Sequence, residues 1–245
     1  VSSINISSGK AISASCVSND NVIADYFIAS ADYAHVEKEL IDEKYRNYTE
    51  NYWNERQFSP SSLIFYLGVD VKVDNLIHHN LFFDEDIDLF SNDIYVNKTW
   101  PKKPLFYASC PSKTDKSTAP NGKENIFLLM PLPAGVKDTE ELREKYFDII
   151  LQKLEKYCKM DIKSKIIYKR SYCVNDFKKD YYSYKGNAYG LANTVSQTAN
   201  LKPKIYNKNV KNLFYTGQLT VPGPGVPPSL ISGKLVADYI IKNCK

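Results

Sequence analysis

The stretch NLFYTGQLTVPGPGVPPSLISGKLVADYII (212–241) carries the most regular pattern in the chain. Residues 212–216 predict a short strand, and a loop rich in glycine and proline follows from Gly217 to Pro228. Residues 229–243 then predict a helix with one apolar face. That face consists of Leu230, Ile231, Leu235, Val236, Tyr239 and Ile240.

A strand, a stiff loop and a helix start, in this order, suit an anionic ligand. Glycines let the backbone approach a ligand closely, and prolines hold the shape of the loop. The first turn of a helix offers unpaired N–H groups and the positive end of the helix dipole. A flavin ring, which becomes anionic on reduction, is such a ligand. A stiff loop that only leads into an ordinary helix has the same pattern, so these residues alone leave both interpretations open.

Upstream of this stretch, strands and helices alternate loosely, which predicts a mixed α/β or α+β fold. Residues 1–17 alternate apolar and polar side chains around a turn, and residues 22–28 predict a more buried strand. Asp32 is then placed to cap a helix over residues 33–40. Residues 41–60 are polar and predict a connection.

The middle of the chain predicts a sheet with a long helix. The strands are expected at 62–73, 105–110, 125–131 and 166–172. A helix over 138–159 has apolar residues at three- and four-residue steps, and Asp138 with Glu141 resembles a capping box. Residues 174–181 predict a shorter helix.

Composition is that of a folded protein with one or two domains. The chain has 245 residues, of which 43% are hydrophobic and 24% charged, and its net charge of +4 is mild. No basic motif interleaved with aromatic residues is present, which argues against a nucleic-acid partner. Five widely spaced cysteines without a CxxC pair argue against a zinc site or a disulfide framework and suit the cytoplasm. No apolar run reaches the ~20 residues of a membrane span, so a soluble or peripheral protein is expected.

Two segments together resemble the C-terminal signature of bacterial-type phytoene and carotenoid desaturases. The first is YSYKGNAYGL (182–191), and the second combines NLFYTG (212–217), PGPGVP (222–227) and SGK (232–234). Several spacings coincide over about 60 residues, which is more specific than one short motif. Weaker similarity extends upstream to Val22–Asp32, Ser59–Ser62 and His78–His79.

The resemblance implies the fold and the activity of an FAD-dependent oxidoreductase related to amine oxidases. Residues 1–40 and 185–245 would form the C-terminal part of a Rossmann-like FAD-binding domain. Residues 41–184 would form an inserted substrate-binding domain on a mixed β-sheet. Such enzymes desaturate phytoene or a related carotenoid precursor by hydride transfer to the flavin, and they contact the membrane peripherally.

The loop before the last helix is the cofactor-binding element that the resemblance implies. Its candidate residues are Gly217, Gln218, Pro222, Gly223, Gly225, Val226, Pro227 and Pro228. The dinucleotide fingerprint G-x-G-x-x-G is absent, so the chain is expected to be a fragment that needs the upstream N-terminal half of the protein and holds FAD poorly alone. The catalytic residues are not identified. Gln218 and Pro228 depart from the family pattern, and Pro228 lacks an N–H that would face the flavin.

The remaining polar residues predict no metal centre. His78 and His79 would point to opposite faces of a strand, and the acidic residues at 84–88 read as a solvated loop. Cys110 has no partnered base. Two alternatives to a desaturase stay open, namely a carotenoid isomerase of the same family and a non-catalytic module that binds an apolar lipid or a partner chain.

Overall fold

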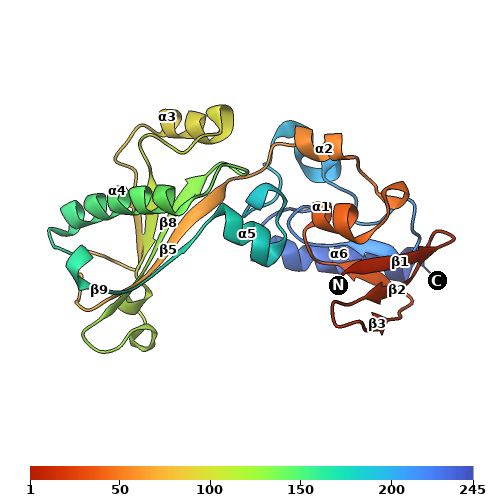
Figure 1. Cartoon of the computed structure of the whole chain (residues 1–245), viewed down its shortest axis with the longest axis horizontal. Coiled ribbons are helices and arrows are strands. Elements are labelled where there is room, and N and C mark those ends of the chain that lie inside the picture. Colours follow the sequence, from red (N-terminus) through yellow and green to blue (C-terminus); the bar gives the residue numbers. More distant parts are fainter. Residues whose placement is uncertain (245) are drawn as a thin grey trace. The chain divides into compact units, whose positions relative to one another are not determined.

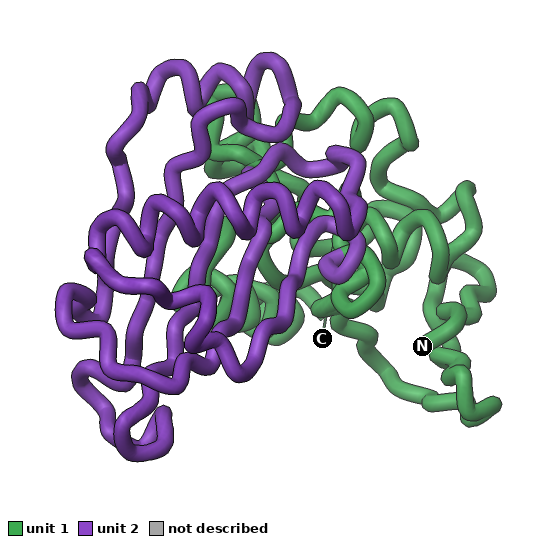
Figure 2. The backbone as a smooth tube through the Cα atoms, turned by 60° about the vertical axis from the view of Figure 1, so that its left-hand side comes forward, with its two compact units in different colours: residues 1–59, 178–245 green, residues 60–177 purple. Residues whose placement is uncertain are grey.

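The computed structural model describes residues 1–244, and the chain divides into two compact units (Figure 2). Unit 1 combines Val1–Ser59 with the segment that starts at Lys178, and unit 2 comprises Pro60–Phe177. These boundaries differ from the expected ones, which lay between residues 40 and 41 and between residues 184 and 185. Residues 41–59 lie in unit 1 because their end pairs with its C-terminal segment, where the Ser59 N–H donates to the Gly190 carbonyl at 2.8 Å.

Unit 1 begins with a small antiparallel sheet. Its strands, in spatial order, are β1 (Ser3–Ser7), β2 (Lys10–Ser15) and β3 (Asn21–Val22). The predicted strand over 22–28 is wrong as a single element, because the chain leaves the sheet at Ile23, which is 82% exposed. The chain then enters a separate strand, β4 (Phe27–Ala29).

A second sheet in unit 1 joins two segments that are distant in sequence. β4 pairs in parallel with β10 (Leu213–Tyr215), which confirms the strand predicted at the end of the chain. Asp32 caps the helix α1 (Tyr33–His35), which continues as a π-helix over Val36–Leu40. The Tyr33 and Tyr215 rings stack with their centroids 3.8 Å apart, so α1 packs on β10.

Two longer helices complete unit 1. α2 (Glu50–Glu55) lies in the segment predicted as a connection; Thr49 caps it, and it buries Trp53. α6 (Val226–Asn243) begins three residues earlier than predicted, because prolines fit the first helical turn. No helix within residues 1–244 is long and apolar enough to cross a membrane.

Unit 2 is built on a five-stranded sheet. In spatial order the strands are β6 (His79–Phe82), β7 (Phe106–Ser109), β8 (Glu124–Leu132), β5 (Ser61–Val69) and β9 (Ile166–Tyr172). Every neighbouring pair is antiparallel, so the expected mixed sheet is wrong. The helix α4 (Glu140–Cys158) does connect two strands of the same direction, β8 and β9, but β5 lies between them.

One face of this sheet and α4 enclose the core of unit 2 (Figure 1). Alternate residues of β5 and β8, such as Phe65 and Leu128, are fully buried against Phe147 and Ile150 of the helix. The predicted capping box at Asp138 is wrong. Thr139 is the N-cap, and its hydroxyl accepts from the Leu142 N–H at 3.4 Å.

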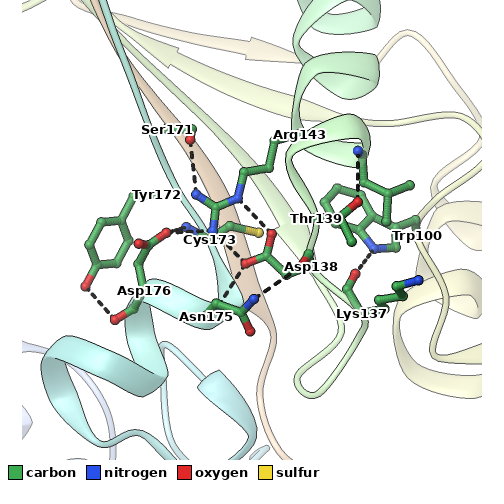
Figure 3. A network of polar contacts seen from close by, with 11 residues as sticks. Trp100, Lys137, Asp138, Thr139, Arg143, Ser171, Tyr172, Cys173, Asn175 and Asp176 are labelled. Atoms are coloured by element: carbon green, nitrogen blue, oxygen red, sulfur yellow. Dashed lines mark hydrogen bonds and ion pairs between the residues drawn. The ribbon is translucent and has the colours of Figure 1, made fainter.

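Asp138 instead anchors a polar network between the start of α4 and the end of β9 (Figure 3). Arg143 donates to both Asp138 oxygens at 2.7 Å, and its guanidinium also pairs with Asp176 at 2.8 Å. Burial raises the pKa of Asp138, but the hydrogen bonds from Arg143 and the Asn175 N–H outweigh it and leave this pKa lowered. The network fixes where β9 leads into α5 (Val174–Tyr181), the helix predicted at these residues.

Unit 2 contains one further α-helix, α3 (Ile87–Asn92), followed by a π-helix over Asp93–Asn97. The remaining helical segments of both units are single 3₁₀ turns. They are Glu43–Tyr45, Pro111–Lys113, Lys116–Thr118, Lys163–Lys165, Tyr184–Gly186, Val195–Gln197 and Ala199–Leu201.

Candidate functional site

Residues 217–225 of the predicted loop connect β10 to α6 in unit 1, and its last three residues, 226–228, form the first turn of α6. Thr220 folds the start of the loop into a turn, because its N–H and its hydroxyl both donate to the Gly217 carbonyl, at 3.0 and 2.9 Å. The Gly217 N–H donates at 2.9 Å to the hydroxyl of Ser232, which is fully buried in α6. These bonds hold the loop at a fixed distance from the helix.

Three glycines of the loop have backbone angles that disfavour other residues. Gly217, Gly223 and Gly225 have φ values of 100°, 132° and 112°. Gly225 is also the N-cap of α6, and Pro228 packs against it. Each of the three positions therefore favours glycine for its conformation.

The start of α6 offers fewer N–H groups than the sequence pattern suggested. Val226 is its first residue, and Pro227 and Pro228 occupy the next two positions. The first intrahelical bond then runs from the Ser229 N–H to the Gly225 carbonyl at 2.9 Å. Because proline has no N–H, Val226 supplies the only donor among the first three residues of this helix. Proline therefore removes two of the N–H groups that the helix start was expected to offer.

The two signature segments meet in the structure through Asn187 and Gly190. The Asn187 amide oxygen accepts from the Gly190 N–H at 2.7 Å and from the Gln218 side chain at 3.4 Å. A Cβ on Gly190 would lie 2.8 Å from the Gln218 carbonyl oxygen. Gly190 is therefore required for the close contact between residues 182–191 and the loop.

Asp32 links the same segment to the β4–α1 connection. Its carboxylate accepts from the Ala34 and His35 N–H groups at 3.0 and 3.2 Å and from the Tyr184 N–H at 3.2 Å. Burial raises the pKa of Asp32 to about 6, although these hydrogen bonds oppose the rise. The Val22–Asp32 stretch and the YKG segment (184–186) both carry the family resemblance, and they belong to one local structure.

A buried lysine that no sequence pattern singled out lies beneath the loop. Lys202 is 2% exposed, and its ammonium has no hydrogen-bond partner within residues 1–244. A Cβ on Gly223 would lie 3.3 Å from its Cε and 3.5 Å from its Nζ. A single lysine between Leu201 and Pro203 resembles any surface lysine in sequence, so only the folded structure identifies it.

Unit 2 carries a second candidate region on the sheet face opposite α4. His79, Tyr107, Phe127 and Tyr66 form a continuous aromatic strip, with one residue from each of β6, β7, β8 and β5. Successive ring centroids are 5.9, 6.2 and 5.5 Å apart. Tyr66 is 39% exposed and the neighbouring Leu81 65%, so this face presents rings and apolar side chains at the surface of the unit.

The two histidines lie side by side, so the prediction that they point to opposite faces is wrong. His78 precedes β6 and is not part of its alternation, and the two rings are 4.2 Å apart. Each imidazole Nδ1 is bonded to a hydroxyl, of Thr114 at 2.6 Å for His78 and of Tyr107 at 2.5 Å for His79.

The other polar candidates have structural partners. Asp86 caps α3, whereas Asp84 and Glu85 pair with Lys153 at 3.0 and 3.4 Å. Cys110 is buried, and burial raises the pKa of its thiol, which makes it a poor nucleophile.

Comparisons with known proteins agree with the sequence resemblance. No protein-family model matches the chain. A carotenoid 3,4-desaturase from Haloarcula japonica is 38% identical over 227 residues, which cover 93% of this chain and 46% of that protein. A 4,4'-diapophytoene desaturase (4,4'-diaponeurosporene-forming) from Staphylococcus aureus is 31% identical over 229 residues, or 89% of this chain and 45% of that protein.

The fold is shared with a larger solved structure. The crystal structure of an oxidoreductase from Methanosarcina mazei superimposes with a TM-score of 0.60 at 14% identity, over 97% of this chain and 48% of that one. The chain thus spans about half the length of the curated relatives and of the solved structure that it matches. It is a homologue of the carotenoid desaturases, with about half of their length.

Proposed function

We propose that this chain is the C-terminal half of an FAD-dependent desaturase of phytoene or a related carotenoid precursor. The observation that carries the proposal is the contact between the two signature segments at Gly190 and Gln218, which joins them into one local structure. When bound, FAD would supply the acceptor for the hydride that desaturation removes. The two relatives described above are named desaturases, which favours this activity over isomerisation.

The residues of unit 1 fit the ring end of a flavin rather than its phosphates. Gly217, Gly223 and Gly225 have backbone angles that only glycine adopts readily, and Val226 offers one N–H at the helix start. The Lys202 ammonium lies against this loop and has no hydrogen-bond partner among the described residues 1–244. We therefore assign residues 217–228 to holding and orienting the ring.

Exposed apolar residues on unit 1 support the proposal that a second half of the protein packs there. The parallel sheet has only β4 and β10 among residues 1–244, and Ile28 of β4 is 52% exposed. The predicted apolar face of α6 is largely uncovered, with Leu230 73% and Ile231 49% exposed. Exposed apolar area of this kind marks an interface. We propose that the dinucleotide-binding half of the same protein covers it, since the chain matches about half of its relatives' length.

The aromatic strip of unit 2 supports an apolar polyene as substrate. A conjugated chain is flat and apolar, and contact with successive rings spaced 5.5 to 6.2 Å apart would hold it extended. Peripheral contact with a membrane, from which such a lipid would be drawn, belongs to this proposal. On this view unit 2 positions the substrate, and the flavin loop lies in unit 1.

Product analysis tests the proposed reaction. The chain is expressed together with its dinucleotide-binding half and supplied with phytoene. Products with additional double bonds are expected. An unchanged number of double bonds with altered geometry would indicate an isomerase, and a colourless, inactive protein would indicate a non-catalytic module.

A strip variant tests the placement of the substrate. Phe127→Ala removes the ring in the middle of the strip, and we expect the KM for the polyene to rise about tenfold, since aromatic contacts contribute about 1 kcal/mol each beyond burial. Tyr95→Ala is the control, because Tyr95 is 43% exposed and lies outside the strip. Equal effects of the two substitutions would contradict the placement.

A further inference from the structure

Lys202 differs from the other shielded lysines of the chain. Lys113 and Lys153 have side chains that are 18% exposed, and each pairs with a carboxylate, Glu124 at 2.7 Å and Asp84 at 3.0 Å. Lys202 is 2% exposed, and its Nζ has no hydrogen-bond partner within residues 1–244. Burial lowers the pKa of Lys202, because a charge without a partner is poorly solvated there. An unpaired buried ammonium destabilises a fold, so its place requires another explanation.

The ammonium lies directly against the candidate flavin loop. The Nζ is 3.5 Å from the point where a Cβ on Gly223 would stand, and the Asn193 Oδ1 is 3.9 Å from the same point. Gly223 has a φ of 132°, so this position excludes a side chain by conformation as well as by space. The Lys202 side chain therefore packs against the backbone of the loop at Gly223.

The Lys202 ammonium supplies positive charge near a helix start that has few N–H donors. Pro227 and Pro228 leave α6 with Val226 as the only N–H donor among its first three residues, so the helix contributes little hydrogen bonding to an anion. A full positive charge beneath the same loop supplies attraction that does not depend on those donors.

We infer that Lys202 is a positioning residue that stabilises negative charge on a flavin ring bound at the loop 217–228. The inference rests on the proposed function, because it takes the loop to be the flavin site. Reduction by two electrons gives the ring a negative charge, so the cation favours the reduced ring over the oxidised one. Lys202 thereby raises the reduction potential of the site without touching the substrate.

The test measures how strongly each redox state of FAD binds the chain. The ¹⁵N-labelled chain is titrated anaerobically with oxidised and with reduced FAD at a mildly alkaline pH, and the amide signals of Gly217, Gly223 and Gly225 are followed by NMR. Weak binding is expected without the dinucleotide fingerprint, and such titrations measure weak affinities. Lys202→Met removes the charge at similar length, and Lys204→Met removes an exposed lysine two residues away as the control.

The wild-type chain and Lys204→Met are expected to bind reduced FAD more tightly than oxidised FAD. In Lys202→Met this preference falls about tenfold, the effect of one unit charge about 12 Å away at an effective dielectric constant of about 20. For a two-electron couple that loss equals about 30 mV in potential. Lys202→Arg, which keeps the charge, should retain most of the preference.

Two results would overturn the inference in distinguishable ways. If the loop amides respond to FAD but Lys202→Met keeps the full preference for the reduced form, the role of Lys202 is wrong and the flavin site stands. If the wild-type loop amides respond to neither form, even when the dinucleotide-binding half is added, the proposed function fails as well. Lys202→Gln provides a second neutral variant should the methionine variant not fold, and it must show the same loss of preference.

Discussion

Replacing Gly190 by alanine should disrupt the contact on which the candidate site depends. The φ of Gly190 is 71°, a conformation that costs an alanine about 1–2 kcal/mol. The new Cβ would also stand 2.8 Å from the Gln218 carbonyl oxygen, which is backbone and cannot rotate away. Overpacking of this kind adds about 1–3 kcal/mol. We therefore expect Gly190→Ala to destabilise unit 1 by about 2–5 kcal/mol.

Gly122→Ala is the matched control for this substitution. Its φ of 80° is similar, but no atom lies within 4 Å of the point where its Cβ would stand, so only the conformational cost of about 1–2 kcal/mol remains. Native-state hydrogen exchange reports each unit separately. The Ala192 N–H, bonded to the Gln57 carbonyl at 2.9 Å, reports unit 1, and the amides of β8 report unit 2. Equal costs for the two variants would refute the close contact between Gly190 and Gln218.

Two further predictions concern buried charges. Burial raises the pKa of Glu37 from 4.5 to about 7. Between these two pH values the folded state keeps a proton that the unfolded chain releases. Unit 1 should therefore lose about 3 kcal/mol of stability as the pH rises from 4.5 to about 7. Urea unfolding against pH should show this loss in the wild type and a flatter profile in Glu37→Gln; parallel profiles would contradict it. Arg143→Met leaves the fully buried Asp138 carboxylate without its cation and should cost about 3–5 kcal/mol in urea unfolding, and Arg143→Lys less. Equal stability of Arg143→Met and the wild type would contradict this role.

Elements with a strong local pattern could be predicted from the sequence. The apolar runs became β5 and β8, the three- and four-residue steps became α4, and α5 begins and ends at the predicted residues. Asp32 caps its helix as expected, because an N-cap bond involves only neighbouring residues. These features depend on contacts within a few residues.

Features set by distant contacts could not be predicted. The antiparallel direction of the unit 2 sheet follows from the insertion of β5 between β8 and β9, and α2 is stabilised by packing of Trp53 in the core rather than by its own periodicity. Leu230 belongs to the apolar stripe of α6 and is nevertheless exposed. An apolar stripe predicts that a helix face will be covered, but not by which part of the protein.

The candidate site shows the same division. The glycines of the loop are candidates through the family resemblance, whereas Lys202 has no sequence signal, because its burial arises only when residues 202 and 223 come together. The sequence pattern also predicts more free N–H donors at the helix start than the structure has. The reason is that the pattern does not show that α6 begins at Val226 with both prolines inside it.

Anaerobic absorption spectroscopy tests the central claim most directly. The chain is purified together with its dinucleotide-binding half, and a carotenoid precursor is added in the absence of oxygen. We predict that the protein is yellow with an oxidised flavin band and that this band bleaches as the substrate is desaturated. A protein without a flavin band, or a band that no carotenoid precursor bleaches, would contradict the assignment of this chain to an FAD-dependent desaturase.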